Sequence, residues 1–407
     1  MAISLLFRNR GTFVRLRCVS PAIKAALMLL SLNMLCISEV SAREWLIEPS
    51  ISTSAQYNDN PRLSENAQTE ISKVTLSPTV KLGYHTPRIE FVSSMRLHSS
   101  KYNKQIFDSN DWYGDALLRK KSELSHVELA VDYAYDSTQV SEIEDTGLVQ
   151  DNKRRSRFGI HPAWQYQVDF KNRLNINYSF DDVSYNEGQA SGLFDYNNQL
   201  LSTRLLHQLR IKTFVGLMVY ASRFNSSGRG SEFTDIGFQG SYKYSLTETM
   251  ELELAGGVRQ TDLEVALSSL DTSNKVEGSD AGGVYSASLV RRWQRTRIEA
   301  SLQRSIEPSG SGYVVLRNQA VLRLKQQLTE KWTALFSLKR AENNALIDEI
   351  KGVDRNYISF DSRLSWRWDR NITLSGLYRY QQQKYDTRAN TAQGNSIEAR
   401  LNYRWVR

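Results

Sequence analysis

Five histidines are the first side chains of this 407-residue chain to consider for chemistry: His85, His98, His126, His161 and His207. No two of them have the spacing of a metal-binding pair on a helix, so no metal site is predicted. His98 and His161 fall where side chains would face an enclosed lumen, and a serine beside either one could form a nucleophilic pair. Serines are too numerous for one partner to be selected, and a lone lumen histidine is more often an ordinary wall residue. The sequence therefore predicts no catalytic residue, no cofactor and no enzyme.

Charged side chains are the second candidate group, because they recur at alternate positions along the chain. The residues expected to line a pore are Arg96, Arg204, Lys243, Arg259, Arg297, Arg323, Lys325, Arg363, Arg367, Arg379, Arg400, Arg404, Glu128, Asp132, Asp181, Glu251, Glu253 and Glu299. Basic residues concentrate in the second half of the chain, and acidic residues are relatively common in the first. If the halves face each other, a transverse field would tune ion selectivity. The alternative is that the charges pair into ladders that fill the wall, and the sequence leaves both interpretations open.

The elements that must position these side chains are β-strands. In the segment 397–405 (IEARLNYRW) the odd positions are apolar and the even positions are charged or polar. Successive side chains of a strand point to opposite faces, so each such strand has one apolar and one polar face. Repeated around a closed sheet with the apolar face outward, this pattern predicts a transmembrane antiparallel up-and-down β-barrel.

Turn residues divide the chain into about eighteen strands, with sixteen as the lower bound. The predicted strands are 45–58, 71–84, 88–101, 111–122, 125–138, 154–168, 172–185, 195–208, 212–225, 232–245, 248–262, 280–292, 296–308, 312–326, 330–343, 354–368, 371–385 and 394–407. Short turns alternate with long polar loops at 59–70, 139–153, 186–194, 263–279, 344–353 and 386–393, which is typical of outer-membrane barrels. Loops 139–153 and 263–279 are long enough to fold inward. Pro49, Pro78 and Pro162 lie inside predicted strands and indicate bulges or strand ends.

Tryptophan positions support a membrane location. Seven tryptophans lie near short turns or termini, and only Trp112 lies by a long loop; the seven are Trp45, Trp164, Trp293, Trp332, Trp366, Trp368 and Trp405. Indole rings favour the membrane interface, so one rim is expected to carry an aromatic girdle. A soluble propeller or sandwich would explain the alternation, but neither the tryptophan clustering nor the alternating loop lengths. We therefore expect a barrel in the outer membrane of a Gram-negative bacterium.

Residues 1–42 have the features of a secretory signal peptide, and residues 43–407 are expected to form a single barrel domain. Basic residues precede an apolar run at 25–37, and Val40, Ser41 and Ala42 supply small residues for cleavage. Both cysteines, Cys18 and Cys36, lie in this segment, which excludes disulfides and thiol chemistry from the mature chain. The formal charge falls from +8 to +4 without the segment, which does not indicate nucleic-acid binding.

The start of the predicted barrel resembles a known family. The segment 45–51 (WLIEPSI), followed by 56–63 (QYNDNPRL), is similar to the opening of the beta-barrel porin 2 family, in which a W-x-x-x-P-S-I strand runs into a Y-x-D-N loop. This family includes outer-membrane proteins of the EpsL and VpsM type, which are encoded with exopolysaccharide clusters. The resemblance implies export of a surface or biofilm polysaccharide with periplasmic export components as partners. It implies no catalytic residue.

Three functions remain open on the sequence alone. The first is a monomeric porin, embedded in outer-membrane lipid, that assists exopolysaccharide export. The second is a general or substrate-specific diffusion porin for small solutes. The third is a structural or adhesive surface barrel in which the long loops bind.

Overall fold

The computed structural model describes residues 44–65, 70–146, 153–266, 275–346 and 354–405 of the chain, so the predicted signal peptide lies outside it. The described residues form eighteen strands. The strands are β1 (Glu44–Asn58), β2 (Ile71–His85), β3 (Ile89–Tyr102), β4 (Ser109–Lys121), β5 (Ser125–Ser137), β6 (Arg154–Gln167), β7 (Asn172–Tyr185), β8 (Tyr196–Arg210), β9 (Thr213–Ser226), β10 (Ser231–Thr247), β11 (Met250–Ala266), β12 (Lys275–Arg292), β13 (Thr296–Pro308), β14 (Val314–Gln327), β15 (Trp332–Asn344), β16 (Arg355–Arg367), β17 (Ile372–Tyr385) and β18 (Ala392–Arg404). Apart from the facing ends of β11 and β12, these bounds lie within three residues of the predicted ones.

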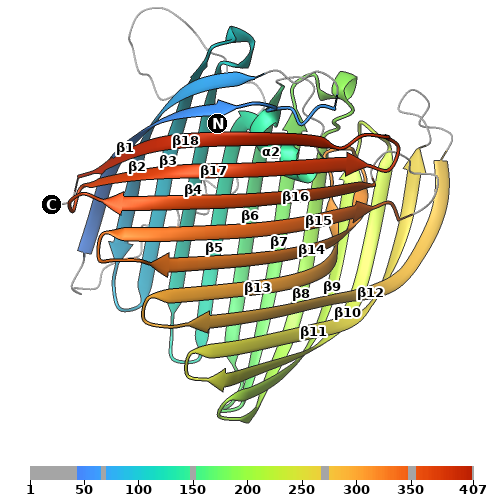
Figure 1. Ribbon diagram of the computed structural model, residues 1–407. Helices are drawn as coiled ribbons and strands as arrows, with labels where there is room; N and C mark the ends of the chain where they lie inside the picture. The colour runs from blue at the N-terminus through green and yellow to red at the C-terminus, as the bar shows by residue number, and fades with distance from the viewer. Residues whose placement is uncertain (1–43, 66–69, 147–152, 267–274, 347–353, 406–407) are drawn as a thin grey trace, which may run out of the picture. The chain divides into compact units, whose positions relative to one another are not determined.

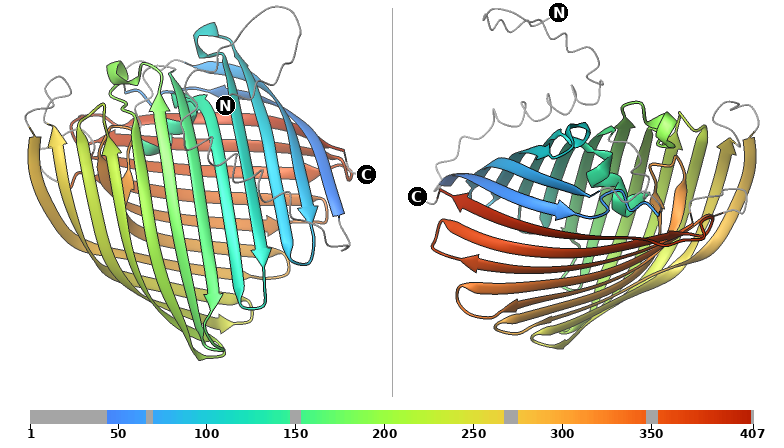
Figure 2. Two further views of the ribbon diagram at one scale, coloured as in Figure 1. Left: turned by 180° about the vertical axis from the view of Figure 1, so that it is seen from behind. Right: turned by 45° about the horizontal axis from the view of Figure 1, so that its top comes forward.

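The sheet closes on itself. Every strand pairs antiparallel with the next strand in the chain, and β1 pairs with β18 from Ser50↔Arg404 to Asn58↔Ser396. In Figure 1, β13 to β18 run across the front while earlier strands rise behind them, and Figure 2 shows the same wall from two other sides. A closed sheet satisfies the backbone amides without a free edge, which is the requirement for strands that cross a bilayer. The predicted antiparallel up-and-down barrel is confirmed.

The outer face of the wall carries exposed apolar side chains. On β18, Ile397 and Leu401 are 62% and 41% exposed, whereas Glu398 and Arg400 between them line an internal cavity. On β11, Val258 is 66% exposed, whereas the neighbouring Arg259 is buried. An apolar exterior around a polar interior is the arrangement of an outer-membrane barrel, in which lipid covers the exposed apolar residues.

Aromatic residues cluster where the short turns join the strands. The rings of Trp332 and Trp366 stack at 5.6 Å, and Trp368 follows at 5.2 Å from Trp366. Tyr403 and Trp405 contact each other edge to face at 4.7 Å. The exposed indoles on this rim match the predicted interfacial girdle.

The three strand prolines mark neither bulges nor strand ends, so that prediction was wrong. The register of β1 against β2 is constant past Pro49, and the register of β2 against β3 is the same on both sides of Pro78. Pro162 likewise causes no shift between β6 and its neighbours. The described register shifts lie instead at Ser245/Thr247 and Gln208/Arg210, beside short turns. A missing N–H therefore removes a ladder bond here without inserting a residue.

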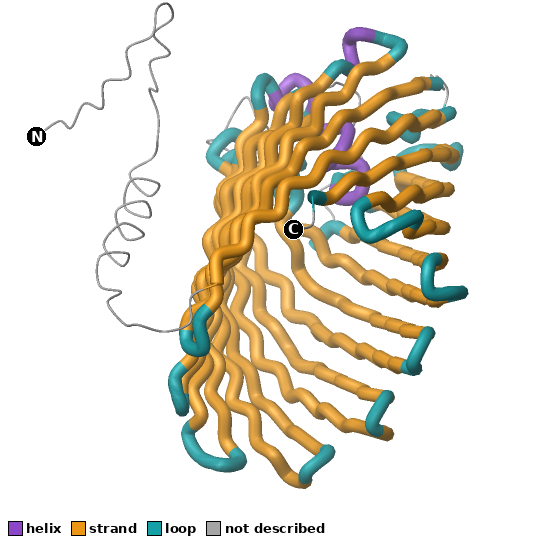
Figure 3. Tube along the Cα trace, turned by 90° about the vertical axis from the view of Figure 1, so that its left-hand side faces the viewer, coloured by secondary structure: helices purple, strands orange, loops and turns teal. Residues whose placement is uncertain are grey.

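The long-loop end differs from the prediction at two places. Residues 263–266 and 275–279 continue β11 and β12 as a paired hairpin up to Ala266↔Lys275, so the long loop predicted at 263–279 was wrong. The segment after β5 contains helix α2 (Thr138–Asp145), and short 3₁₀ turns η2 (Gln105–Phe107) and η3 (Gly188–Ser191) lie in other loops. These helical segments gather at one end of the barrel (Figure 3). No helix among the described residues is long and apolar enough to cross a membrane.

Candidate functional site

The register places all eighteen predicted pore-lining residues on the inner parity of their strands. Most of them contact a neighbouring charge: Lys243 with Glu251 (2.8 Å), Arg204 with Glu253 (3.4 Å), Arg259 with Asp280 (2.5 Å), Arg297 with Glu299, Arg379 with Asp361 (2.5 Å), Arg400 with Glu398 (2.7 Å), Glu128 with Arg119 (2.7 Å), Asp132 with His161 (2.9 Å) and Asp181 with Arg157 (2.8 Å). Arg367 donates to the Glu330 carbonyl at 2.8 Å. No ion pair within 4.0 Å joins the remaining five to a described acid; they are Arg96, Arg323, Lys325, Arg363 and Arg404. Their role in permeation stays a prediction.

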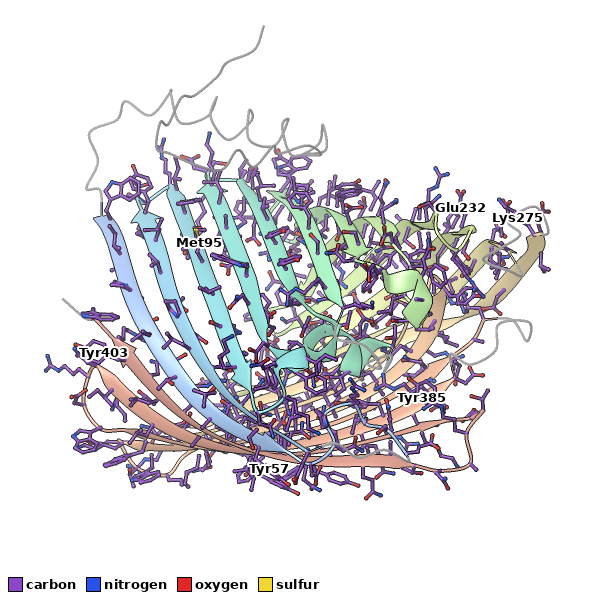
Figure 4. All side chains as sticks on the ribbon, turned by 90° about the horizontal axis from the view of Figure 1, so that it is seen from above. Tyr57, Met95, Glu232, Lys275, Tyr385 and Tyr403 are labelled. Atoms are coloured by element: carbon purple, nitrogen blue, oxygen red, sulfur yellow. The ribbon has the colours of Figure 1, made fainter. Side chains whose placement is uncertain are left out.

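Helix α2 crosses the lumen. It follows β5, but its residues and Thr146 directly after it contact β15, β16 and β17, which lie six to eight strands away around the wall through the β1–β18 seam. Seen from above in Figure 4, α2 lies inside the enclosure formed by the strands. We call residues 138–146 the strap. The predicted inward folding of loop 139–153 is therefore observed for residues 139–146, which the structure describes.

On the near side, Glu142 holds the strap. This side chain is 1% exposed, and its Oε1 accepts a hydrogen bond from the Tyr185 hydroxyl at 2.8 Å. Arg155 Nη1 lies 3.5 Å from the same oxygen. The other oxygen accepts from the Thr146 hydroxyl at 2.8 Å. A buried carboxylate is tolerated because a cation and hydroxyl donors surround it, so removal of one partner would be costly.

On the far side, three strands hold the strap. Arg355 of β16 is 2% exposed and donates to the Glu144 carbonyl at 3.2 Å and to the Ile143 carbonyl. Lys339 of β15 forms an ion pair with the Glu144 carboxylate at 2.7 Å. The Tyr385 hydroxyl of β17 donates to the Thr146 carbonyl at 2.6 Å. The strap is therefore anchored on both sides and narrows the lumen.

The ion pair between Lys339 and Glu144 predicts that the conductance of the channel depends on pH. Burial raises the pKa of the Glu144 carboxyl, but the bond from Lys339 and the charges of Arg379 and Arg355 outweigh burial and hold the pKa below its ordinary value. When the pH is above the ordinary glutamate pKa of about 4.3, the ionised Glu144 carboxylate stabilises the contact with Lys339. This stabilisation is lost when the pH falls through the lower pKa that Glu144 has in the native protein. We expect channel conductance in a planar bilayer to rise on acidification below about pH 4. Glu144→Gln should already have the higher conductance at neutral pH, and an unchanged conductance in both cases would contradict this role of the tie.

Beside the strap lies a cavity of ≈ 370 Å³, here called the basic bay. Its wall comes from β18, β1, β2 and β3, with Asp111 of β4 at its edge, and Val140 of the strap also lines it. The cations Lys73, Lys81, Arg96 and Arg404 border the bay, and none of them has a described carboxylate within 4.0 Å. A floor of serine and threonine side chains lies between them. The surface of the bay is polar and has an excess of positive charge.

A second cavity of ≈ 370 Å³ lies against β8 to β14. Here the inner wall is apolar near the long loops, where Phe224, Phe233 and Leu263 pack against Tyr313 and Val314. Pairing of β12 with β13 stops at Tyr285↔Arg304, and the tip of the β13–β14 hairpin packs against the inner faces of β9 to β11. This apolar contact closes part of the lumen, because buried aromatic and aliphatic groups exclude water.

His161 does have a serine and an acid beside it. Its Nδ1 lies 2.8 Å from the Ser179 hydroxyl, and its Nε2 lies 2.9 Å from Asp132 Oδ1. The Ser179 hydroxyl also donates to Asp181 Oδ2 at 3.2 Å. A carboxylate only accepts, so in a neutral imidazole Nε2–H donates to Asp132, and Nδ1 is left as an acceptor that competes with Asp181 for the single proton of the Ser179 hydroxyl. Asp132, His161, Ser179 and Asp181 therefore form one continuous polar network on the lumen wall, in which the Ser179 hydroxyl has two acceptors within reach.

Arg355, Glu142 and Tyr185, which anchor the strap, were not among the sequence candidates for the pore lining. Arg355 has the same parity as Asp361 and Arg363 on its strand, so alternation could have placed it inside. Its hydrogen-bond acceptors are the backbone carbonyls of residues 143 and 144, and no sequence pattern could have predicted that they would meet Arg355. Glu142 lies in the predicted loop 139–153 and Tyr185 ends the predicted strand 172–185, and neither position reveals a contact across 43 residues of chain.

No family model matches the chain, and no curated protein matches it either. The resemblance to the beta-barrel porin 2 family therefore receives no support. Solved barrels are similar in architecture. Acinetobacter baumannii OccAB2 has 10% sequence identity and a TM-score of 0.47, covering 89% of this chain and 98% of that chain. Pseudomonas aeruginosa OpdL has 10% identity and a TM-score of 0.45, covering 89% and 99%. The unliganded ferric citrate transporter FecA has 11% identity and a TM-score of 0.45, covering 87% and 65%.

At these identities and TM-scores the similar structures do not identify a solute. The assignment rests on the chain's own strand pairing, its apolar exterior and its polar interior. These features make the described chain an eighteen-stranded β-barrel of the outer-membrane type.

Proposed function

We propose that this protein is a diffusion channel for small hydrophilic solutes across the outer membrane. The observation that supports the proposal is the strap, which is tied to both sides of the wall and divides a barrel wide enough for an aqueous channel. A constriction of this kind restricts passage to small solutes, and the polar wall beside it replaces part of their hydration. One chain encloses the whole lumen, so we expect a monomer to be sufficient.

Polysaccharide export is the competing function. The family resemblance alone favours it, and a continuous polymer would require the strap to leave the lumen during transport. An adhesive barrel is the third possibility, in which loops bind and the lumen is unused. All three predict the same barrel, so solute passage must be measured directly.

Swelling of liposomes that contain the purified protein tests the proposal. Neutral sugars of increasing size should enter at rates that fall steeply between monosaccharides and oligosaccharides. The matched comparison is Lys339→Ala combined with Arg355→Ala, which should admit larger sugars because two ties to the strap are lost. Absence of swelling with any sugar, in both proteins, would contradict a diffusion function and favour one of the other two.

A further inference from the structure

We infer that the basic bay binds a hydroxylated organic anion, such as a monosaccharide acid. The inference rests on the proposed diffusion function and names the class of solute that the bay would select.

Two arginines flank two hydroxyls at one level of the wall. The register runs Arg404↔Ser50, Ser50↔Thr79 and Thr79↔Arg96, from β18 through β1 and β2 to β3. Neighbouring strands lie about 4.8 Å apart, so the two arginine backbones are separated by about 14 Å along this row. Long side chains at both ends of such a row can reach a group held over its middle. Arginine is suited to carboxylates because its guanidinium donates two parallel hydrogen bonds.

The floor of the bay continues from this row toward the long loops. Ser52 faces Ser77 and Ser54 faces Thr75 across β1 and β2. The Thr75 hydroxyl lies 2.9 Å from the Ser100 hydroxyl of β3. These small side chains leave the space that the larger neighbours enclose. Each hydroxyl can donate one hydrogen bond and accept others, which matches the alternating donors and acceptors of a sugar ring.

The charges of the bay do not cancel. Asp111 is held by Arg154 at 2.7 Å, and Glu398 is held by Arg400 at 2.7 Å, so both acids are compensated locally. Glu48 is the one other acid that lines the bay in the described part of the chain, facing Lys81 across β1 and β2. Lys73, Arg96 and Arg404 then remain as excess positive charge. A cleft with excess charge of one sign concentrates ions of the opposite sign.

These features together decide the class of solute. Positive charge alone would favour any small anion, and hydroxyls alone would favour a neutral sugar. The bay presents both within one cavity, and Val140 places the strap on its lumen side. An anion that also carries hydroxyls can therefore use the arginine row and the floor at the same time.

Equilibrium binding to the purified full-length protein in detergent tests this site. Glucuronate, acetate and glucose are titrated calorimetrically, with acetate lacking most hydroxyls and glucose lacking the charge. Glucuronate should bind at least about tenfold more tightly than either comparison, because it alone uses both sets of groups. Arg96→Ala with Arg404→Ala should weaken glucuronate binding by about tenfold or more.

Two further variants separate the parts of the site. Ser52→Ala with Ser77→Ala should weaken glucuronate binding and leave acetate binding unchanged. Arg323→Ala, which removes a lumen arginine outside the bay that likewise has no described carboxylate within 4.0 Å, should leave both affinities unchanged. Equal affinity for glucuronate and acetate, or full affinity after loss of Arg96 and Arg404, would overturn the inference. Because binding is measured without transport, liposomes that fail to swell would overturn the diffusion function and leave the binding result intact.

Discussion

Replacing Arg355 with alanine should raise single-channel conductance severalfold and loosen the strap. Arg355 is fully buried and donates to the Ile143 and Glu144 carbonyls and to the Gln383 side chain. Its loss leaves three acceptors without their donor in a nearly dry environment. Each such group costs about 1–3 kcal/mol, so the local contact would be weakened by roughly 3 kcal/mol or more. The strap would then leave the lumen more often.

Arg363→Ala is the matched control, because Arg363 is another inward-facing arginine of β16 with no described acid within 4.0 Å. Its removal should change ion selectivity slightly and leave the size of the conductance step close to that of the unmodified protein. Planar-bilayer recordings of the three proteins provide the comparison. Equal conductance in Arg355→Ala and the unmodified protein would show that the strap does not limit the lumen.

Replacing Leu338 with arginine should severely impair the barrel. Leu338 is 46% exposed on the outer face of β15, six residues beyond the interfacial Trp332. An arginine near the middle of the lipid-facing surface costs about 2–4 kcal/mol in an outer-membrane barrel. We expect loss of folded protein from the outer membrane and a lower unfolding midpoint after refolding into lipid.

Ser337→Arg provides the control one residue away. Ser337 has the parity of Lys339, whose amine reaches the strap, so its side chain faces the lumen. The same arginine should be tolerated there, since water and nearby Asp361 can stabilise the charge. Urea titrations of both variants in lipid vesicles should separate them clearly. Similar stability of the two variants would mean that the assigned inner and outer faces are wrong.

The strand order was predictable because its signal is local. Alternation in segments such as 397–405 defines both a strand and its faces, and turn residues define the ends. The outward positions of Ile397 and Leu401 and the rim position of Trp332 and Trp366 followed from the same period. The predictions at Pro78 and for the loop at 263–279 were wrong because both considered only the local residue types, whereas pairing with neighbouring strands determined the structure. At Pro78, pairing with β1 and β3 keeps the register although the proline lacks an N–H. At 263–266 and 275–279, polar residues continue the β11–β12 hairpin beyond the predicted strand ends.

The strap and the bay were not predictable from local pattern. Glu142 and Tyr185 are far apart in the chain, and the bond between Arg355 and the strap joins residues 212 positions apart. Such contacts depend on the closed sheet, which brings opposite walls together. The bay depends on register: Arg404 and Arg96 reach one level only because β1 and β2 align Ser50 with Thr79. A shift of one residue would turn these side chains to the other face.

Single-channel recording of the purified full-length protein in a planar bilayer tests whether one closed wall encloses a lumen that the strap narrows. The unmodified protein should show small, stepwise conductance with a preference for anions, and Lys339→Ala with Arg355→Ala should increase the step. Absence of any ion conductance in both proteins, when both are folded in the bilayer, would contradict a water-filled lumen behind the strap.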